Sequence, residues 1–381
     1  MSPVAKRTCS KLSPEALVVG VSRNILMPAL KVANSLVRYK IGCPRPFFVS
    51  YQITFRCNRR CMFCDAWKLK NPKELDTDQA KKIVSELGDL GVGILGITGG
   101  EPLIRRDLEE IAAVARRKGV VVGVNTNGTL LTPKRAKSIS SVFDTVFVSL
   151  DGFEETHDKI RGEEGTFRAA LAGLKNLLAV KGDCVVGVNF VLNNVNYKEF
   201  IPFCNWIKNL GVFITGFPVG GEDDFVSAYS IPSDKVDGFV LDVLKEKQTN
   251  PFIGPSEKVI EYFPKFVKGE MPHICDAGRL YMGVSPIGDL RICPILPNSP
   301  DWKIGSLVTS SMAELLGTSR FQQVLEASKN CKSCLAGCTT PYSLLFRGSA
   351  PDLAKEAFTY YRVVRNGGDH ALSFSDAEQL S

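Results

Sequence analysis

The stretch Cys57-Asn58-Arg59-Arg60-Cys61-Met62-Phe63-Cys64 carries three cysteines in the spacing C-x3-C-x2-C, directly after an apolar, strand-like run from Phe47 to Phe55. Three thiolates on one tight loop can hold three irons of a cubane [4Fe–4S] cluster, and the fourth iron then has no protein ligand nearby in sequence. Such an open metal position is where a substrate or cofactor binds. The alternatives are a zinc site or a set of buried thiols. For zinc, Cys43 is the only nearby candidate for a fourth ligand.

The composition is that of a soluble globular protein with one large domain, with or without a small appendage. The chain has 381 residues, of which 44% are hydrophobic and 23% are charged. Its 12 cysteines cluster along the sequence, and no secretory signal is evident. Disulfide scaffolds are shorter and denser in cysteine. We therefore expect metal ligation in a reducing, cytoplasmic compartment.

The net charge of +7 bears on possible partners. A positive surface could dock an acidic electron donor such as a ferredoxin or a flavodoxin, although ordinary solvated lysines would explain the charge equally well. The basic residues are not interleaved with aromatic ones in the manner of nucleic-acid-binding modules, so we expect no nucleic-acid partner.

The first 46 residues predict an amphipathic helical extension. Apolar residues recur there at roughly helical spacing, with Arg23, Lys31, Arg38 and Lys40 between them. The uncharged part is far shorter than the ~20 apolar residues that span a bilayer. The segment either lies on an anionic membrane surface, as a peripheral contact, or packs against the domain.

From residue 47 to residue 221, strand-like and helix-like patterns alternate. Strands are predicted at 48–55, 93–98, 120–125, 145–150, 185–191 and 212–217, and helices at 77–91, 107–118, 133–140, 166–181 and 198–210. This alternation predicts βαβ units and a parallel sheet. Six strands favour an α/β fold with a partial (β/α)6 TIM-like barrel, whose site residues would follow the C-terminal ends of the strands.

Several motifs together resemble the radical SAM superfamily. The cysteine spacing matches, with an aromatic residue, Phe63, just before the third cysteine. Thr98-Gly99-Gly100-Glu101-Pro102 follows the second predicted strand, and Ser149-Leu150-Asp151-Gly152 follows the fourth. The next run, from His157 to Gly162, together with these motifs resembles the branch of molybdopterin, haem-d1 and peptide-modifying maturases.

The resemblance implies that S-adenosylmethionine (SAM) chelates the open iron of the Cys57, Cys61 and Cys64 cluster. It also implies that the loop of Gly99, Gly100, Glu101 and Pro102 hydrogen-bonds the SAM amino group, because adjacent glycines allow close backbone approach. Arg161 either pairs with the SAM carboxylate in a bidentate fork or forms a structural salt bridge with Asp151. The remaining candidates are Asn125, Asn127, Ser149 and Asp151 for the ribose, and Asn189 and Asn193 for the adenine.

A second cysteine group consists of Cys275, Cys293, Cys331, Cys334 and Cys338. Its opening, C-x12-G-x4-C, resembles the auxiliary-cluster motif of SPASM and twitch domains. The run from Tyr281 to Cys293 predicts a hairpin with a turn near 286–289, which would bring the first two cysteines together. Full SPASM domains have seven cysteines, so the five present favour one auxiliary [4Fe–4S] cluster. Either Cys334 or Cys338 is its fourth ligand. On spacing alone, a structural zinc ribbon would fit equally well.

The predicted organisation is an N-terminal extension (1–46), a radical SAM partial barrel (47–221), a connecting segment (222–269), a small cysteine-rich SPASM/twitch-like domain (270–345), and a C-terminal helix and tail (346–381). The resemblance implies reductive cleavage of SAM to a 5′-deoxyadenosyl radical, which abstracts hydrogen from an unactivated C–H bond. The substrate stays open among a lipid or isoprenoid, a tetrapyrrole and a peptide. The alternative is a non-catalytic, zinc- or cluster-stabilised scaffold or a redox-sensing binding protein.

Overall fold

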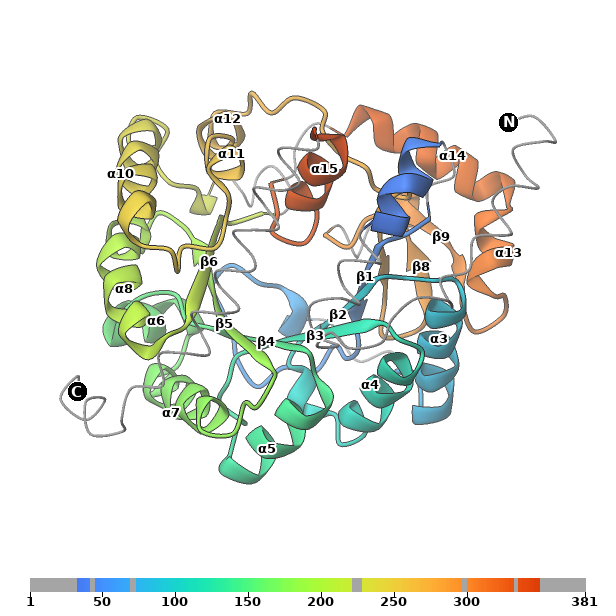
Figure 1. Cartoon of the computed structure of the whole chain (residues 1–381), viewed down its shortest axis with the longest axis horizontal. Helices are drawn as coiled ribbons and strands as arrows, with labels where there is room; N and C mark the ends of the chain where they lie inside the picture. The colour runs from blue at the N-terminus through green and yellow to red at the C-terminus, as the bar shows by residue number, and fades with distance from the viewer. Residues whose placement is uncertain are drawn as a thin grey trace.

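One nine-stranded sheet forms the centre of the molecule, in the order β6-β5-β4-β3-β2-β1-β7-β8-β9 (Figure 1). The structure is a computed structural model that describes residues 33–41, 45–68, 73–220, 228–295, 300–331 and 335–349. The strands are β1 (Phe48–Gln52), β2 (Ile94–Thr98), β3 (Val121–Thr126), β4 (Thr145–Ser149), β5 (Val185–Leu192), β6 (Phe213–Pro218), β7 (Tyr281–Val284), β8 (Asp289–Arg291) and β9 (Lys303–Ser306).

The predicted partial barrel is confirmed. Strands β1 to β6 are all parallel, and the strand order is linear, with β6 and β9 at its two ends among the described strands. Each of these six strands lies within about three residues of its predicted bounds. The largest difference is at β1, which ends at Gln52 instead of Phe55.

Helices cover the outside of the barrel (Figure 1). They are α3 (Thr77–Asp89), α4 (Leu108–Arg117), α5 (Pro133–Val142), α6 (Glu154–Arg161), α7 (Thr166–Leu178) and α8 (Phe200–Ile207). Local sequence fixes their starts. Asp76 and Gln79 form a reciprocal capping box at α3, and Thr132 caps α5 just before Pro133. Helix α6 was not predicted.

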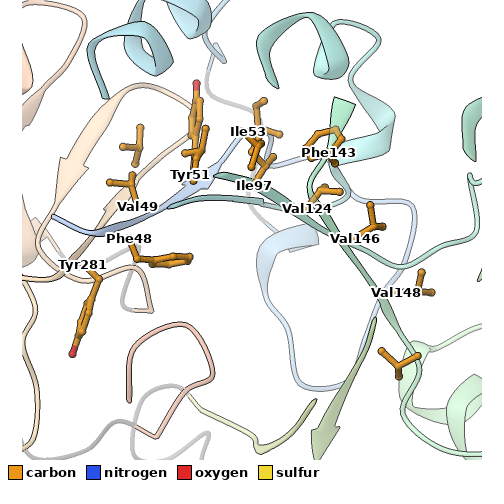
Figure 2. Close-up of a cluster of buried hydrophobic side chains, with 14 of the residues drawn as sticks. Phe48, Val49, Tyr51, Ile53, Ile97, Val124, Phe143, Val146, Val148 and Tyr281 are labelled. Carbon is orange, nitrogen blue, oxygen red and sulfur yellow. The ribbon is translucent and has the colours of Figure 1, made fainter. Parts of the chain in front are cut away.

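The core lies between the sheet and these helices. Alternate strand residues such as Val49, Tyr51, Ile97 and Val124 are fully buried on the helix side, while Phe48 points to the opposite side of β1 (Figure 2). Side chains on the inner side of β2 and β4 are partly exposed. Because strand side chains alternate between faces, every second residue of each strand lines the inside of the barrel.

The stretch interpreted as a connector also folds. It forms α10 (Val236–Thr249), α11 (Glu257–Ile260) and α12 (Phe263–Val267). Val236, Phe239 and Phe263 are buried in the same core, and Ile253 bridges to Ile214 of β6. This segment therefore extends the barrel at its β6 side.

The predicted hairpin is confirmed. β7 and β8 are antiparallel, and the turn closes with a hydrogen bond from the amide of Gly288, at φ +84°, to the carbonyl of Ser285. β7 also pairs in parallel with β1, so the hairpin continues the barrel sheet. The helices that follow are α13 (Met312–Leu316), α14 (Ser319–Ala327) and α15 (Thr340–Arg347).

The described part of the N-terminal extension packs against the domain, which was one of its two expected roles. Residues 33–40 are helical. The Tyr39 ring meets Phe346 edge-on at 5.8 Å, and its hydroxyl donates to Asp276 at 3.1 Å. None of the described helices has the length and apolar character needed to cross a bilayer. Residues 1–32, Cys43, Cys334 and the predicted C-terminal helix beyond residue 349 lie outside the described residues.

Candidate active site

The three cysteines of the first motif lie on the loop that leaves the C-terminal end of β1. Cys61 is buried, whereas Cys57 and Cys64 are partly exposed, and none of the three is in a disulfide. The Met62 amide donates to the carbonyl of Ile160 on α6 at 2.9 Å. The loop is therefore attached to a helix about a hundred residues further along the chain.

The two glycines after β2 pack directly against the chain that leads into the cysteine loop. The Gly100 amide donates to the Thr54 carbonyl at 2.8 Å, and the Glu101 amide donates to the Arg56 carbonyl at the same distance. A Cβ atom on Gly100 would lie 2.2 Å from the Arg56 carbonyl oxygen. Gly99 has φ +138° and would place a Cβ 2.5 Å from the Thr54 oxygen. These contacts require glycine at both positions whatever ligand binds there.

Glu101 was expected to contact the SAM amino group, and in the structure its carboxylate is hydrogen-bonded within the protein. Its carboxylate is 1% exposed and accepts hydrogen bonds from the Leu103 amide, the Thr126 hydroxyl and the Asn127 amide, at 3.0, 2.7 and 2.7 Å. Burial raises the pKa of Glu101, and these donors oppose that rise. The carboxylate thus joins the end of β2 to the end of β3.

The side chain of Asn127 is also hydrogen-bonded within the protein. Its side-chain amide donates to the Asn58 carbonyl oxygen at 2.7 Å, and its own oxygen accepts from the Thr129 hydroxyl at 2.7 Å. Asn58 in turn donates to Thr129 at 3.1 Å. This polar triangle ties the cysteine loop to the turn after β3. Asn58, which the sequence motif treats only as a spacer, is one residue that sequence reasoning missed.

Arg161 forms the structural salt bridge that was the alternative to SAM binding. Its Nε atom donates to Asp151 at 2.7 Å, and both side chains are almost fully buried. The guanidinium also lies 3.6 Å from the Cys61 sulfur and 5.5 Å from the Phe63 ring centroid. Asp151 also accepts from the Val191 amide at 2.8 Å. One buried cation therefore faces both the loop sulfur and the carboxylate.

The thiols of the loop are in an environment that suits metal-bound thiolates. Burial raises the pKa of Cys57 to about 11, against an opposing hydrogen bond from the Arg59 amide, and burial also raises the pKa of Cys64. Thiols whose pKa is raised in this way ionise at neutral pH only where positive charge lies nearby. Iron supplies that charge, and Arg161 adds to it, so the donor set fits a [4Fe–4S] cluster.

The inner face of the barrel carries a row of polar side chains near the strand ends. The Asn189 amide donates to Asn125 at 3.0 Å and accepts from the Thr215 hydroxyl at 2.5 Å. Ser149 is in register with Asn189. Asn125, Ser149 and Asn189 were predicted, whereas Thr215 was missed. Thr215 lies on β6 in register with Asn189. Aligning the predicted strands by register could therefore have identified it.

Asn193, a weaker candidate for adenine contact, is fully buried. Its side chain donates to the Val191 carbonyl at 3.0 Å and accepts from the Val195 amide at 2.9 Å. The amide therefore stabilises the turn after β5, and its contact with adenine stays a prediction.

The second cysteine group lies beside β7 and α15. Among its described members, the pKa of Cys275 is raised mainly by burial and also by Cys331. The pKa of Cys338 is raised to about 12 by burial and then by Cys293. The open choice between Cys334 and Cys338 is not tested, since Cys334 lies outside the described residues.

Two family models match this chain. That of the radical SAM superfamily matches residues 51–207, and that of an iron–sulfur cluster-binding domain, SPASM, matches residues 275–338. The first range contains the cysteine loop and three members of the polar row, Asn125, Ser149 and Asn189, and the second contains the whole second cysteine group. The matches confirm the expected [4Fe–4S] cluster, SAM and an auxiliary iron–sulfur cluster as cofactors. They favour iron over zinc at the second group.

Two curated relatives show how far the similarity extends. Fe-coproporphyrin III synthase of Methanosarcina barkeri is 40% identical over 154 residues, which are 40% of this chain and 38% of that protein. Mycofactocin maturase of Mycobacterium tuberculosis is 30% identical over 270 residues, which are 69% of this chain and 68% of that protein. The chain thus spans well under half of the first relative and about two thirds of the second.

A solved structure supports the fold. The structure of anSMEcpe with bound AdoMet and Cp18Cys peptide superposes with a TM-score of 0.60 at 18% identity, over 85% of this chain and 99% of that one. At this identity the likeness concerns the fold alone. The two family models and the mycofactocin maturase match show that the chain belongs to the radical SAM superfamily of enzymes and carries a C-terminal SPASM-type iron–sulfur domain.

Proposed function

We propose that this enzyme cleaves SAM reductively and abstracts a hydrogen atom from an unactivated C–H bond of a substrate held inside the barrel. The observation that carries the proposal is the loop of three thiols at the end of β1, which the Gly99-Gly100 turn and α6 hold in place. A [4Fe–4S] cluster bound there supplies the electron that breaks SAM into methionine and a 5′-deoxyadenosyl radical.

In this proposal each part of the site has one task. Cys57, Cys61 and Cys64 hold three irons, and Arg161 offsets the negative charge at the Cys61 sulfur. The row of Asn125, Ser149, Asn189 and Thr215 contacts the SAM nucleoside from the inner face of the sheet. Glu101 and Asn127 position the loops through their hydrogen bonds within the protein.

The second group holds the auxiliary cluster through Cys275, Cys293, Cys331 and one of two further cysteines, Cys334 or Cys338. The match of the iron–sulfur cluster-binding domain to residues 275–338, which include all of these cysteines, supports this. A cluster held by these cysteines would supply an electron-transfer centre, either for an electron from a ferredoxin or flavodoxin or for one from the substrate radical.

The names of the relatives support two of the expected substrate classes. Fe-coproporphyrin III synthase suggests a porphyrin, and mycofactocin maturase, which aligns over more of the chain, suggests a peptide. Anaerobic incubation with SAM and dithionite, in the presence of a coproporphyrin, a mycofactocin-precursor peptide or an isoprenoid lipid, separates the classes. The true class is expected to increase the release of 5′-deoxyadenosine.

The core assignment has a direct test. Reconstituted protein is expected to hold about eight irons, as two cubanes. Changing Cys57, Cys61 and Cys64 together to alanine should abolish 5′-deoxyadenosine release while the auxiliary absorbance stays. The matched control is Cys184→Ala, because this core thiol is buried and belongs to neither cysteine group. SAM cleavage that survives the triple change, or one or two zincs in place of iron, would refute the proposal.

A further inference from the structure

Tyr281 is a buried phenol on β7, next to the second cysteine group. Its side chain is 2% exposed, and it lies opposite Phe48 in the parallel β1–β7 ladder. Figure 2 shows Tyr281 and Phe48 on one side of the sheet and Tyr51 on the other. On the Tyr281 side, Tyr342 of α15 stacks on Phe48 with ring centroids 5.3 Å apart. Strand pairing and helix packing therefore hold the phenol in one place.

The hydroxyl of Tyr281 has a complete set of partners. It donates to the Cys275 sulfur at 3.2 Å and accepts from the Asp276 amide at 3.0 Å. The Ser343 hydroxyl lies 3.4 Å away and can donate to the second lone pair. The single phenolic proton is then left for the sulfur, which becomes the strongest acceptor once it is a metal-bound thiolate.

The loop that carries Cys275 is fixed from a second direction. Arg347 of α15 binds the carboxylate of Asp276 through two nitrogens, at 2.9 and 3.0 Å. The same guanidinium donates to the Cys275 carbonyl at 3.3 Å. Because both ends of the O–H···S contact are held by the fold, the hydrogen bond does not depend on a mobile side chain.

We propose that Tyr281 is a positioning residue that sets the reduction potential of the auxiliary cluster through its hydrogen bond to Cys275. The inference rests on the proposed role of Cys275 as a cluster ligand. Reduction adds negative charge to a cluster and its thiolates, so a donor aimed at a ligand sulfur stabilises the reduced state and raises the potential. Without the hydroxyl, the cluster becomes harder to reduce.

The test is a redox titration of the auxiliary cluster alone, followed by electron paramagnetic resonance. The full chain is used with Cys57, Cys61 and Cys64 changed to alanine, so that only the auxiliary cluster gives a signal. Tyr281→Phe in this background keeps the ring and removes the donor. The reduced-to-oxidised ratio at a fixed potential is expected to fall about tenfold, a midpoint shift of about 59 mV for one electron.

Two further variants make the result decisive. Tyr51→Phe removes another buried phenol hydroxyl, which has no hydrogen-bond partner in the described part of the chain, and it should leave the midpoint unchanged. Cys275→Ala should abolish the intact auxiliary cluster. An unchanged midpoint in Tyr281→Phe, or loss of its cluster, would overturn the tuning role. An intact auxiliary cluster in Cys275→Ala would instead overturn the ligand assignment.

Discussion

Replacing Gly100 with alanine should disable the cysteine loop, although Gly100 contributes no side chain to it. The added Cβ would lie 2.2 Å from the Arg56 carbonyl oxygen, whereas real Cβ contacts essentially never fall below 3.0 Å. The atoms in the way are backbone atoms of Phe55 and Arg56, which no rotamer change can move. The chain entering Cys57 must therefore shift, and the hydrogen bonds of Gly100 to Thr54 and of the following amide to Arg56 weaken.

The size of this effect follows from its two parts. Overpacking typically costs about 1–3 kcal/mol, and each of two hydrogen bonds contributes about 1 kcal/mol. The apoprotein should therefore lose about 3–5 kcal/mol in its free energy of unfolding in urea. After anaerobic reconstitution, the iron and sulfide content should fall by one cluster, with the auxiliary cluster retained.

The matched control for this variant is Gly238→Ala. Gly238 is exposed in α10, and a methyl group added to it would meet no heavy atom within 4 Å. Alanine there should stabilise the protein by up to about 1 kcal/mol, because it reduces the backbone freedom of the unfolded chain. A Gly100→Ala protein with full iron content and unchanged unfolding free energy would refute the reasoning.

Three further predictions follow from buried groups. Asp151→Asn should lower the free energy of unfolding by about 3 kcal/mol, because it leaves the buried Arg161 without its counter-charge. His157→Asn should flatten the fall in stability below pH 6.5, because burial lowers the pKa of His157 from 6.5 to about 3. Neutral His157 contributes its full stabilisation above pH 6.5. On acidification towards pH 3 this contribution is lost, at no more than about 1.4 kcal/mol per pH unit. Tyr39→Phe should cost about 1 kcal/mol in urea unfolding, since Asp276 loses one donor.

Each of these predictions has its own check. For Asp151→Asn the control is Glu154→Gln, whose pair with Arg168 is largely exposed and should contribute under about 1 kcal/mol. Equal losses in the two variants would contradict the buried-pair argument. An unaltered pH slope in His157→Asn would show that this ring is not the titrating group. A Tyr39→Phe protein as stable as the parent would mean that Arg347 alone satisfies Asp276.

The strands and the cysteine loop could be predicted because their signals are local. Short β-branched runs mark β2 to β6, and the C-x3-C-x2-C spacing belongs to one continuous segment. Helix α6 could not be found in this way. Its buried face consists of His157, Ile160 and Arg161, so two of the three inward residues are polar and the apolar periodicity is lost.

The roles of Glu101 and Asn127 could not be read from the sequence either. Both sit in motifs that suggest ligand contact, and both have partners from other segments: Glu101 bonds to Thr126 at the end of β3, and Asn127 bonds to Asn58 of the cysteine loop. Only the folded sheet brings these segments together. The sequence identifies polar residues at the mouth of the barrel, and tertiary contacts decide which of them are already used.

The shared strand β1 has a mechanical consequence for catalysis. Its backbone hydrogen-bonds to β2 along one edge and to β7 along the other. The barrel and the SPASM-type region therefore cannot move relative to each other at this strand without breaking backbone hydrogen bonds. The spacing between metal centres held by the two cysteine groups would therefore be limited by the β1–β7 ladder. Deleting the SPASM-type region would also expose the edge of β1 that pairs with β7. We expect such a truncated barrel to aggregate, because unpaired strand edges pair with other chains.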